Sequence, residues 1–204
     1  NGACRRRAGG GVGVYKKKIP QGAGLGGGSS NAASTLLALN DLWNLKLSTD
    51  KLCEVGIKLG ADVPVFLHRN SAWGEGIGEK LEALELDERW YLVITPPCLV
   101  STHKIFCHQQ LTRNSPAIKI ADFLAGRSRN DCEAITTKLY PEVANTLNLL
   151  NKFAKSRMTG TGSSVFAEFK SEVDAMATLA KLPKSLQVFI AKGINSLDEK
   201  LVGV

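Results

Sequence analysis

Five glycines fall within seven positions near the start of this 204-residue chain, in the segment PQGAGLGGGSSNAA that begins at Pro20. A glycine loses more conformational entropy on folding than any other residue, so such a cluster in an ordered loop needs a structural reason. Without Cβ atoms, successive backbone N–H groups can converge on an anion. We therefore interpret this segment as a loop that binds phosphate groups.

An amphipathic helix is predicted directly after the loop. From Asn31 onward, apolar residues recur on one helical face, at Ala32, Leu36, Leu39 and Trp43. A helix N-terminus carries a positive partial charge and unpaired N–H groups, and both favour a bound phosphate. A predicted strand over Val12–Ile19, then the glycine loop, then this helix is an order typical of a polyphosphate site. A flexible Gly/Ser linker would not lead straight into such a helix.

The loop matches neither of the two commonest phosphate-binding motifs. No Lys-Ser/Thr pair follows the glycines, as a P-loop requires, and no acidic residue follows at the spacing of a dinucleotide fold. The segment instead resembles the ATP-binding motif of the galactokinase/homoserine kinase/mevalonate kinase/phosphomevalonate kinase superfamily. The resemblance implies that ATP, accompanied by Mg²⁺, contacts the following residues: Pro20, Gln21, Gly22, Ala23, Gly24, Leu25, Gly26, Gly27, Gly28, Ser29 and Ser30.

Two further segments resemble motifs of the same superfamily. LGADVPVF (Leu59–Phe66) resembles the segment that carries the catalytic aspartate, which implies that Asp62 accepts the proton of the substrate hydroxyl or orients it. On the residues alone, Asp62 is a turn residue before an extended segment. RMTGTGSSVF (Arg157–Phe166) resembles the third motif, which implies a turn that packs against the glycine loop and shapes the nucleotide site. The residues of that turn are Gly160, Thr161, Gly162 and Ser163.

The segments GGGSSNAA and GADVPVF resemble one branch of the superfamily more than the others. That branch phosphorylates the 2-hydroxyl of methylerythritol linked to cytidine diphosphate, in non-mevalonate isoprenoid biosynthesis. The resemblance implies that Thr102 and Phe106 contact this small-molecule substrate, although Phe106 could instead pack in the core. Two alternatives stay open. One is another kinase of the superfamily, such as a homoserine or mevalonate kinase. The other is a non-catalytic nucleotide-binding remnant or a nucleic-acid-associated fragment that uses the basic N-terminus.

One part of the family pattern has no counterpart in this sequence. The family's N-terminal segment supplies a lysine beside the catalytic aspartate, in a Pro-x-Lys-x-Asn motif, and no such motif occurs here. A cation at that place would stabilise the charge that develops on the transferred phosphoryl group. We therefore expect an N-terminally truncated sequence with an incomplete first domain, which binds ATP but turns over slowly or not at all.

Strands and helices intermix with long gaps between the strands, which predicts an α+β fold. The resemblance implies two domains, with an N-terminal part like domain 2 of ribosomal protein S5 and a ferredoxin-like C-terminal part. We expect residues 1–76 and 77–195 to form these domains, joined at the loop Trp73–Gly78, with a tail at 196–204. The other predicted elements are a helix from Ser48 or Thr49 to Gly60, an extended segment Ala61–Leu67, strands Tyr91–Thr95, Ser164–Phe169 and Gln187–Ala191, and helices Asp131–Lys138, Pro141–Ala154 and Glu172–Lys181.

Charge and composition exclude several classes of protein. The formal net charge of +7 arises from the first 18 residues, because the other 186 carry 20 basic residues against 19 acidic ones. No apolar run approaches the roughly 20 residues that cross a bilayer, and no signal peptide is visible. We therefore expect a cytoplasmic protein without a membrane or nucleic-acid partner. Five scattered cysteines and three histidines lack the spacing of a metal cluster, and the sequence does not identify the ligands of Mg²⁺.

Overall fold

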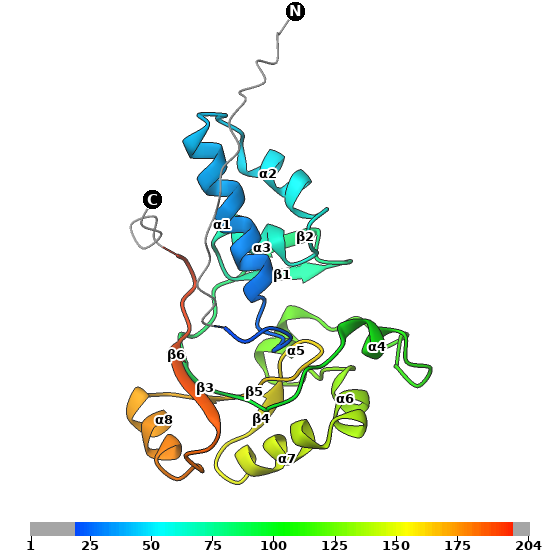
Figure 1. Ribbon diagram of the computed structural model, residues 1–204, viewed down its shortest axis with the longest axis vertical. Coiled ribbons are helices and arrows are strands. Elements are labelled where there is room, and N and C mark those ends of the chain that lie inside the picture. The colour runs from blue at the N-terminus through cyan, green and yellow to red at the C-terminus, as the bar shows by residue number, and fades with distance from the viewer. Residues whose placement is uncertain (1–18, 198–204) are drawn as a thin grey trace, which may run out of the picture.

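The structure is a computed structural model of the chain, and it describes residues 19–197 (Figure 1). It has an N-terminal part (residues 19–83) and a C-terminal part (residues 84–197). The N-terminal part contains α1 (Gly27–Leu42), α2 (Thr49–Gly56), α3 (Val63–His68) and an antiparallel hairpin of β1 (Ala72–Glu75) and β2 (Lys80–Ala83). The C-terminal part contains β3 (Trp90–Thr95), α4 (Thr102–Phe106), α5 (Ile120–Leu124), α6 (Glu133–Leu139), α7 (Pro141–Leu150), β4 (Ser156–Met158), β5 (Val165–Phe169), α8 (Glu172–Leu179) and β6 (Gln187–Lys192).

The C-terminal part is built on one antiparallel sheet of four strands in the order β4-β5-β3-β6. The chain follows the order strand, helices, two strands, helix, strand, and this order together with the strand arrangement confirms the predicted ferredoxin-like topology. Leu92 in β3 pairs with Ala167 in β5 and with Ile190 in β6. All three side chains belong to a single core because alternate residues of a strand point to the same face.

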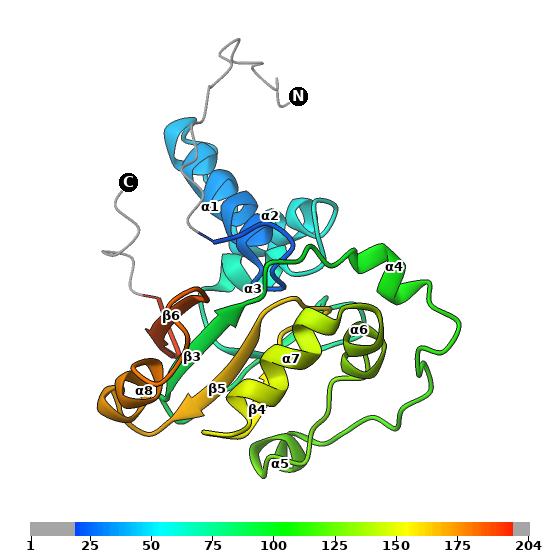
Figure 2. The same cartoon turned by 60° about the horizontal axis from the view of Figure 1, so that its bottom comes forward.

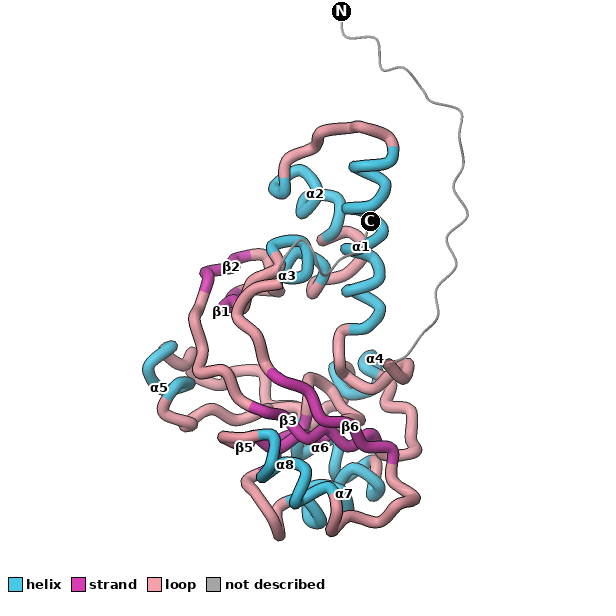
Figure 3. The backbone as a smooth tube through the Cα atoms, turned by 90° about the vertical axis from the view of Figure 1, so that its left-hand side faces the viewer, coloured by secondary structure: helices cyan, strands magenta, loops and turns pink. Residues whose placement is uncertain are grey.

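Helices cover one face of this sheet and close its core. Figure 3 shows α6, α7 and α8 together on one side of the sheet, while α1, α2 and α3 lie on the other side. Leu92, Ile94, Val143, Leu150 and Val165 are fully buried between the strands and α7. The apolar run of β3 and the alternating buried residues of β5 thus meet the apolar stripe of α7.

The core of the N-terminal part is small. Its buried members are Ala33 of α1, Leu52 of α2, and Val63 and Leu67 of α3. Gly56 allows α2 and α3 to approach closely, because a Cβ atom at this position would lie 2.8 Å from Cγ1 of Val63. The predicted cap of α2 is confirmed, since the Ser48 hydroxyl accepts a hydrogen bond from the N–H of Lys51.

Several elements differ from the prediction. The segment expected to be extended is helix α3, where Pro64 occupies the first turn, which needs no N–H donor, and Val63 and Leu67 share one buried face. The predicted loop Trp73–Gly78 is partly strand, because β1 pairs with a β2 that the sequence did not reveal. Helix α1 begins four residues before the predicted start at Asn31.

The remaining predictions agree to within a few residues. Strands β3, β5 and β6 and helices α6, α7 and α8 are confirmed, although α7 ends before the predicted Ala154 and α2 before Gly60. Helices α4 and α5 and strand β4 were not predicted. The predicted strand at Val12–Ile19 lies outside the described residues except for Ile19. The proposed division at residues 76 and 77 falls in the turn of the β1–β2 hairpin and stays a prediction. Within residues 19–197, no helix is long and apolar enough to span a bilayer.

Candidate functional site

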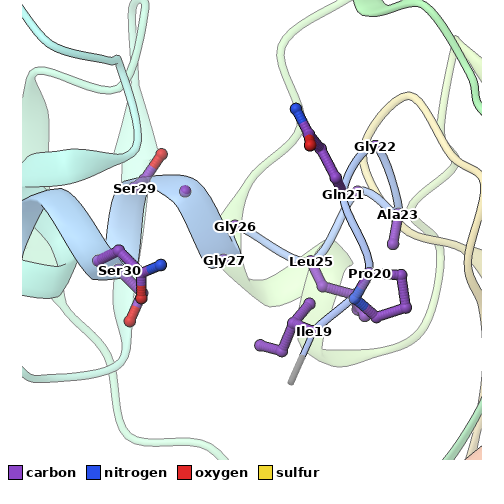
Figure 4. Close-up of a pocket in the computed structure, with 13 residues that line it drawn as sticks. Ile19, Pro20, Gln21, Gly22, Ala23, Leu25, Gly26, Gly27, Ser29 and Ser30 are labelled. Carbon is purple, nitrogen blue, oxygen red and sulfur yellow. The ribbon is translucent and has the colours of Figure 1, made fainter. Parts of the chain in front are cut away.

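The glycine loop, residues 20–26, has a backbone that favours glycine at three positions. Gly22, Gly24 and Gly26 have φ values of 71°, 71° and 65°, in the left-handed region that costs other residues steric strain. Gly26 is also the N-cap of α1, and its carbonyl accepts the N–H of Ser30 at 2.9 Å. The spacing of glycines at alternate positions therefore sets the path of the chain into the helix (Figure 4).

The glycine loop docks on the turn Thr159–Ser164, which we call the TGTGSS turn. The N–H of Ser164 donates to the carbonyl of Ala23 at 3.0 Å, and the N–H of Ser163 donates to the carbonyl of Gly22 at 3.3 Å. The Thr159 hydroxyl also donates to the carbonyl of Ala23, at 3.2 Å. A Cβ atom at Gly24 would lie 2.7 Å from the carbonyl oxygen of Gly162, so only glycine fits. The predicted packing of this turn against the loop is therefore present, and its contact with a nucleotide stays a prediction.

Two side chains that the sequence did not point to hold the TGTGSS turn in place. The amide of Asn130 donates to the carbonyls of Gly160 at 2.7 Å and Met158 at 3.2 Å. The buried Thr136 hydroxyl donates to the carbonyl of Thr161 at 3.1 Å. Asn130 lies just before α6, where an Asn is also an ordinary capping residue, so its sequence position gave no separate signal.

The predicted turn residues are mostly turned inward. Thr161 and Ser163 are buried. Gly160 and Gly162 have positive φ values and form the bends. Contacts from this turn to a ligand would therefore come from backbone groups rather than from the Ser163 hydroxyl.

A cavity of about 460 Å³ opens at the glycine loop and is lined by residues 19–31 (Figure 4). Gly28 lines it, and a Cβ atom at this position would meet no heavy atom within 4 Å. Gly27, Gly28 and Ser29 open the first turn of α1, where the backbone N–H groups have no partner within the helix; the N–H of Ser30 already donates to the carbonyl of Gly26. That turn contains no acidic residue, so its positive end is free to attract an anion.

Asp62 is not among the residues that line this cavity, but it belongs to a segment that packs against the start of α1. Asp62 is the exposed N-cap of α3, and its side chain makes no capping hydrogen bond. A Cβ atom at Gly60 would lie 3.6 Å from Oγ of Ser29, and one at Gly26 would lie 2.9 Å from the ring of Phe66. The segments on both sides of Asp62 are thus held against the beginning of α1, and its carboxylate is left accessible.

The two predicted substrate residues lie on α4. The Thr102 hydroxyl lies 3.0 Å from the hydroxyl of Thr161, which joins the start of α4 to the TGTGSS turn. Phe106 is 50% exposed, whereas its neighbour Ile105 is fully buried, so Ile105 and not Phe106 fills the core. Thr102 and Phe106 are four residues apart and share one face of the helix.

Residues 19–197 contain no cluster of side chains that could form a metal centre by itself. No three side chains of histidine, cysteine, aspartate or glutamate in residues 19–197 are placed to hold a metal ion.

Two family models match the chain. The model of the GHMP kinases N terminal domain matches residues 2–70, and the model of the GHMP kinases C terminal domain matches residues 111–187. Together they cover both the glycine loop with Asp62 and the TGTGSS turn.

Curated relatives agree with these matches. The chain is 53% identical over 179 residues to the 4-diphosphocytidyl-2-C-methyl-D-erythritol kinase of Pseudomonas paraeruginosa, covering 88% of this chain and 64% of that protein. It is 51% identical over 179 residues to the enzyme of the same name from Shewanella halifaxensis, with 88% and 63% covered. The chain thus spans less than two thirds of the length of these relatives.

Two solved structures share the fold. A crystal structure of a 4-(cytidine 5′-diphospho)-2C-methyl-D-erythritol kinase superposes with a TM-score of 0.72 at 29% identity, covering 87% of this chain and 68% of that one. The homoserine kinase of Cytophaga hutchinsonii superposes with a TM-score of 0.57 at 16% identity, covering 88% and 68%, and shows a shared fold alone.

Proposed function

Because the chain belongs to the GHMP kinase family, we propose that it binds ATP at the glycine loop and serves the transfer of the γ-phosphoryl group to a small-molecule alcohol. The proposed acceptor is the 2-hydroxyl of 4-diphosphocytidyl-2-C-methyl-D-erythritol, the substrate named by relatives that are about half identical to this chain.

The geometry that carries this proposal is the docked glycine loop. Its bends are fixed by left-handed glycines, its carbonyls are held by the TGTGSS turn, and its cavity opens at the N-terminus of α1. The bends of the loop are therefore held by contacts within the protein, and a preformed cradle lowers the entropic cost of holding a triphosphate. Mg²⁺, when bound, would neutralise charge on the phosphate oxygens.

Asp62 is the proposed acceptor of the substrate proton. As the hydroxyl oxygen attacks the γ-phosphorus, the bond from that phosphorus to the β,γ-bridging oxygen breaks, and the hydroxyl proton passes to the Asp62 carboxylate. In phosphoryl transfer most of the acceleration comes from positioning and charge stabilisation, so Asp62 would also orient the hydroxyl. Its exposed, uncapped carboxylate beside the start of α1 suits both roles. Thr102 and Phe106 would contact the substrate from α4.

Gly28→Ala tests the nucleotide site without disturbing the fold. The added methyl group meets no protein atom but projects where a phosphate would lie. Alanine in the first turn of α1 should keep or raise stability, by up to about 1 kcal/mol, because glycine is the weaker helix former. We therefore expect the affinity for ATP to fall at least about tenfold in isothermal titration calorimetry, while the melting temperature does not fall.

Gly74→Ala is the matched control. Gly74 lies in β1, where a Cβ atom would make an ordinary contact of 3.5 Å with Leu81, far along the chain from the loop. This variant should bind ATP as the parent does. Equal ATP affinity in the parent and in Gly28→Ala would contradict the proposed site.

A further inference from the structure

Three backbone segments that are far apart in the sequence meet at the boundary between the two parts. They are residues 69–71, which follow α3, residues 84–89, which lead into β3, and residues 193–197, which follow β6. We call residues 193–197 the strap. Figure 1 shows the chain after β6 rising from the sheet toward the N-terminal part. The strap thus starts from the C-terminal part and reaches a segment of the N-terminal part.

The strap pairs with the backbone that directly follows α3. The N–H of Ser71 donates to the carbonyl of Asn195 at 2.7 Å, and the N–H of Leu197 donates to the carbonyl of Arg69 at 2.9 Å. The pairing is antiparallel, as in a β-bridge. Because α3 spans six residues, or about 9 Å, Asp62 at its N-cap is only one short helix away from the strap.

The side chain of Asn195 makes a second connection, to the segment before β3. Its Oδ1 accepts the N–H of Leu86 at 2.8 Å, and its Nδ2 donates to the carbonyl of Leu86, also at 2.8 Å. The amide therefore pairs with Leu86 as the backbone of a neighbouring strand would. The N–H of Leu84 extends the connection, since it donates to the carbonyl of Ser71 at 2.9 Å. Asn195 is thus the residue through which the three segments are joined.

The other end of the strap is fixed on the sheet. The N–H of Gly193 donates to the carbonyl of Arg89 at 2.8 Å, and a Cβ atom at Gly193 would lie only 2.7 Å from the ring of Tyr91. Tyr91 lies in β3, which pairs along its length with β6. The strap therefore leaves the sheet from a closely packed start, and its far end sets the position of the segment to which it bonds.

We propose that Asn195 is a positioning residue that sets how the N-terminal part, and with it Asp62, stands relative to the sheet of the C-terminal part. It acts through Ser71 and Leu86 rather than by touching ATP or the acceptor. This inference rests on the proposed function, because Asp62 belongs to one part and Thr102, which would contact the acceptor, belongs to the other. A misplacement of about 1 Å between reacting groups can cost about a hundredfold in rate, so a fixed joint between the parts matters.

Both side-chain bonds of Asn195 require an amide of this length. A carboxylate only accepts hydrogen bonds, so aspartate at position 195 could accept from the N–H of Leu86 but could not donate to its carbonyl. Alanine would make neither bond. Asn195→Asp and Asn195→Ala therefore break the joint in two different ways, one of which keeps the shape of the side chain.

Trp73 provides a measure of where the N-terminal part stands. It follows Ser71 by two residues, and its ring contacts that of Phe123 in α5 edge to face, with centroids 5.6 Å apart. Figure 2 shows β6 at one edge of the sheet and α5 beyond the opposite edge, so Trp73 meets the C-terminal part at a different place from the strap. If the strap no longer holds the segment after α3, the Trp73 ring should leave Phe123 and become more exposed to water.

The test uses the 204-residue chain with Trp43→Phe and Trp90→Phe, so that Trp73 is the only tryptophan. Asn195→Ala and Asn195→Asp should both shift the Trp73 emission to longer wavelength and raise its quenching constant with iodide at least about twofold, because the ring loses an apolar neighbour. Asn195→Ala should bind ATP within about twofold of this parent in isothermal titration calorimetry, because the glycine loop and the TGTGSS turn bond to each other without the strap.

Two controls separate placement from stability. Ser196→Ala changes an exposed side chain within the strap and should leave the emission as in the parent. Asn151→Ala removes the acceptor of the Ser156 N–H at the end of α7, so it should lower the melting temperature without shifting the Trp73 emission. Parent-like emission in Asn195→Ala, whatever its melting temperature, would overturn the proposal, because the bonds of Asn195 would then serve stability alone.

The proposed function and this inference can fail separately. If ATP binds to the parent but the Trp73 emission of Asn195→Ala is unchanged, the inference fails and the proposed nucleotide site stands. If ATP does not bind but the emission shifts, the proposed function fails and the joint at Asn195 stands. A loss of ATP affinity of about tenfold or more in Asn195→Ala would show that the strap holds the nucleotide site itself, and it would overturn the assignment of the strap to the placement of Asp62.

Discussion

The two parts of the molecule differ in how much core they bury. The C-terminal part encloses twelve buried residues between its sheet and its helices, whereas the N-terminal part encloses four. Both parts expose some large apolar side chains, such as Leu42 at 70% in the N-terminal part and Val173 at 76% in the C-terminal part, so the difference lies in the buried cores. Since burial of apolar surface is the main stabilising contribution to folding, the C-terminal part is the stable half.

The glycine loop is held in place by the part with the larger core. The loop belongs to the N-terminal part by sequence, but its carbonyls are held by the TGTGSS turn of the C-terminal part. The better-packed half thus positions the loop, while the less-packed half supplies the helix dipole and Asp62. The following predictions test this division.

The largest expected effect is on the free energy of unfolding, when one buried leucine of each core is replaced by alanine. Leu150→Ala removes a fully buried side chain from the C-terminal core and should lower the free energy of unfolding by about 4 kcal/mol. Leu52→Ala in the N-terminal core should cost about 2 kcal/mol, because partly exposed neighbours can close around the cavity. Urea denaturation followed by circular dichroism measures both. An equal or greater loss in Leu52→Ala would show that the two cores are equally well packed.

The second prediction separates backbone strain from lost docking. Gly24 and Gly126 have nearly equal φ values of 71° and 70°, but a Cβ atom at Gly24 would meet backbone oxygens, whereas one at Gly126 would meet nothing within 4 Å. Gly126→Ala should therefore cost only the strain of the left-handed conformation, about 1 kcal/mol. Gly24→Ala should cost about 2 kcal/mol or more and reduce ATP affinity at least about tenfold, because the loop must leave the turn.

Thermal melting and ATP titration of the two variants distinguish these effects. If Gly24→Ala bound ATP as Gly126→Ala does, docking of the loop on the TGTGSS turn would not be needed for nucleotide binding.

The third prediction concerns the support of the turn. Asn130→Ala removes donors to the carbonyls of Gly160 and Met158 and should cost about 1–2 kcal/mol. It should also raise the dissociation constant for ATP several-fold, because the turn that holds the loop becomes mobile. Asn151→Ala is the control, since Asn151 accepts the N–H of Ser156 at the far end of α7. This control should lower stability without changing ATP affinity, and equal ATP affinities for both variants would argue against a positioning role for Asn130.

The smallest expected effect is a difference in alkylation rate between the thiols of Cys98 and Cys132 and the exposed thiol of Cys107. Burial raises the pKa of Cys98, as does the charge of Glu142, and burial followed by the charge of Asp131 raises the pKa of Cys132. A raised pKa means less thiolate at a given pH, so alkylation of these two residues should become fast only above the ordinary range of a thiol. Cys107 is exposed and should react with iodoacetamide first at pH 8, as peptide mass spectrometry would show. Equal rates for Cys98 and Cys107 would indicate that the segment after β3 opens readily.

Local patterns in the sequence were sufficient for most of the C-terminal part (β3, β5, β6, α6, α7 and α8), but they did not reveal the short elements α4, α5 and β4. Strand β3 is an unbroken apolar run, and α7 has a first-turn proline and one apolar face, so each was recognisable by itself. The segment 61–67 was not recognisable as a helix from its sequence, because valine and proline locally favour extended backbone. Packing of Val63 and Leu67 against α1 and α2 decides in favour of the helix there.

The sequence alone determined the glycine loop. Glycines at alternate positions followed by an amphipathic helix form a short-range pattern, and its cause is local because each glycine lacks a Cβ atom. It also pointed to Asp62 and to the TGTGSS turn as segments, through their resemblance to the family. Only the tertiary structure decided that Asn130 and Thr136 hold the turn and that Asn195 joins the segments after α3 and before β3. The physical reason is that hydrogen bonds between side chains and the backbone of distant segments depend on distance in space and leave no periodic pattern along the chain.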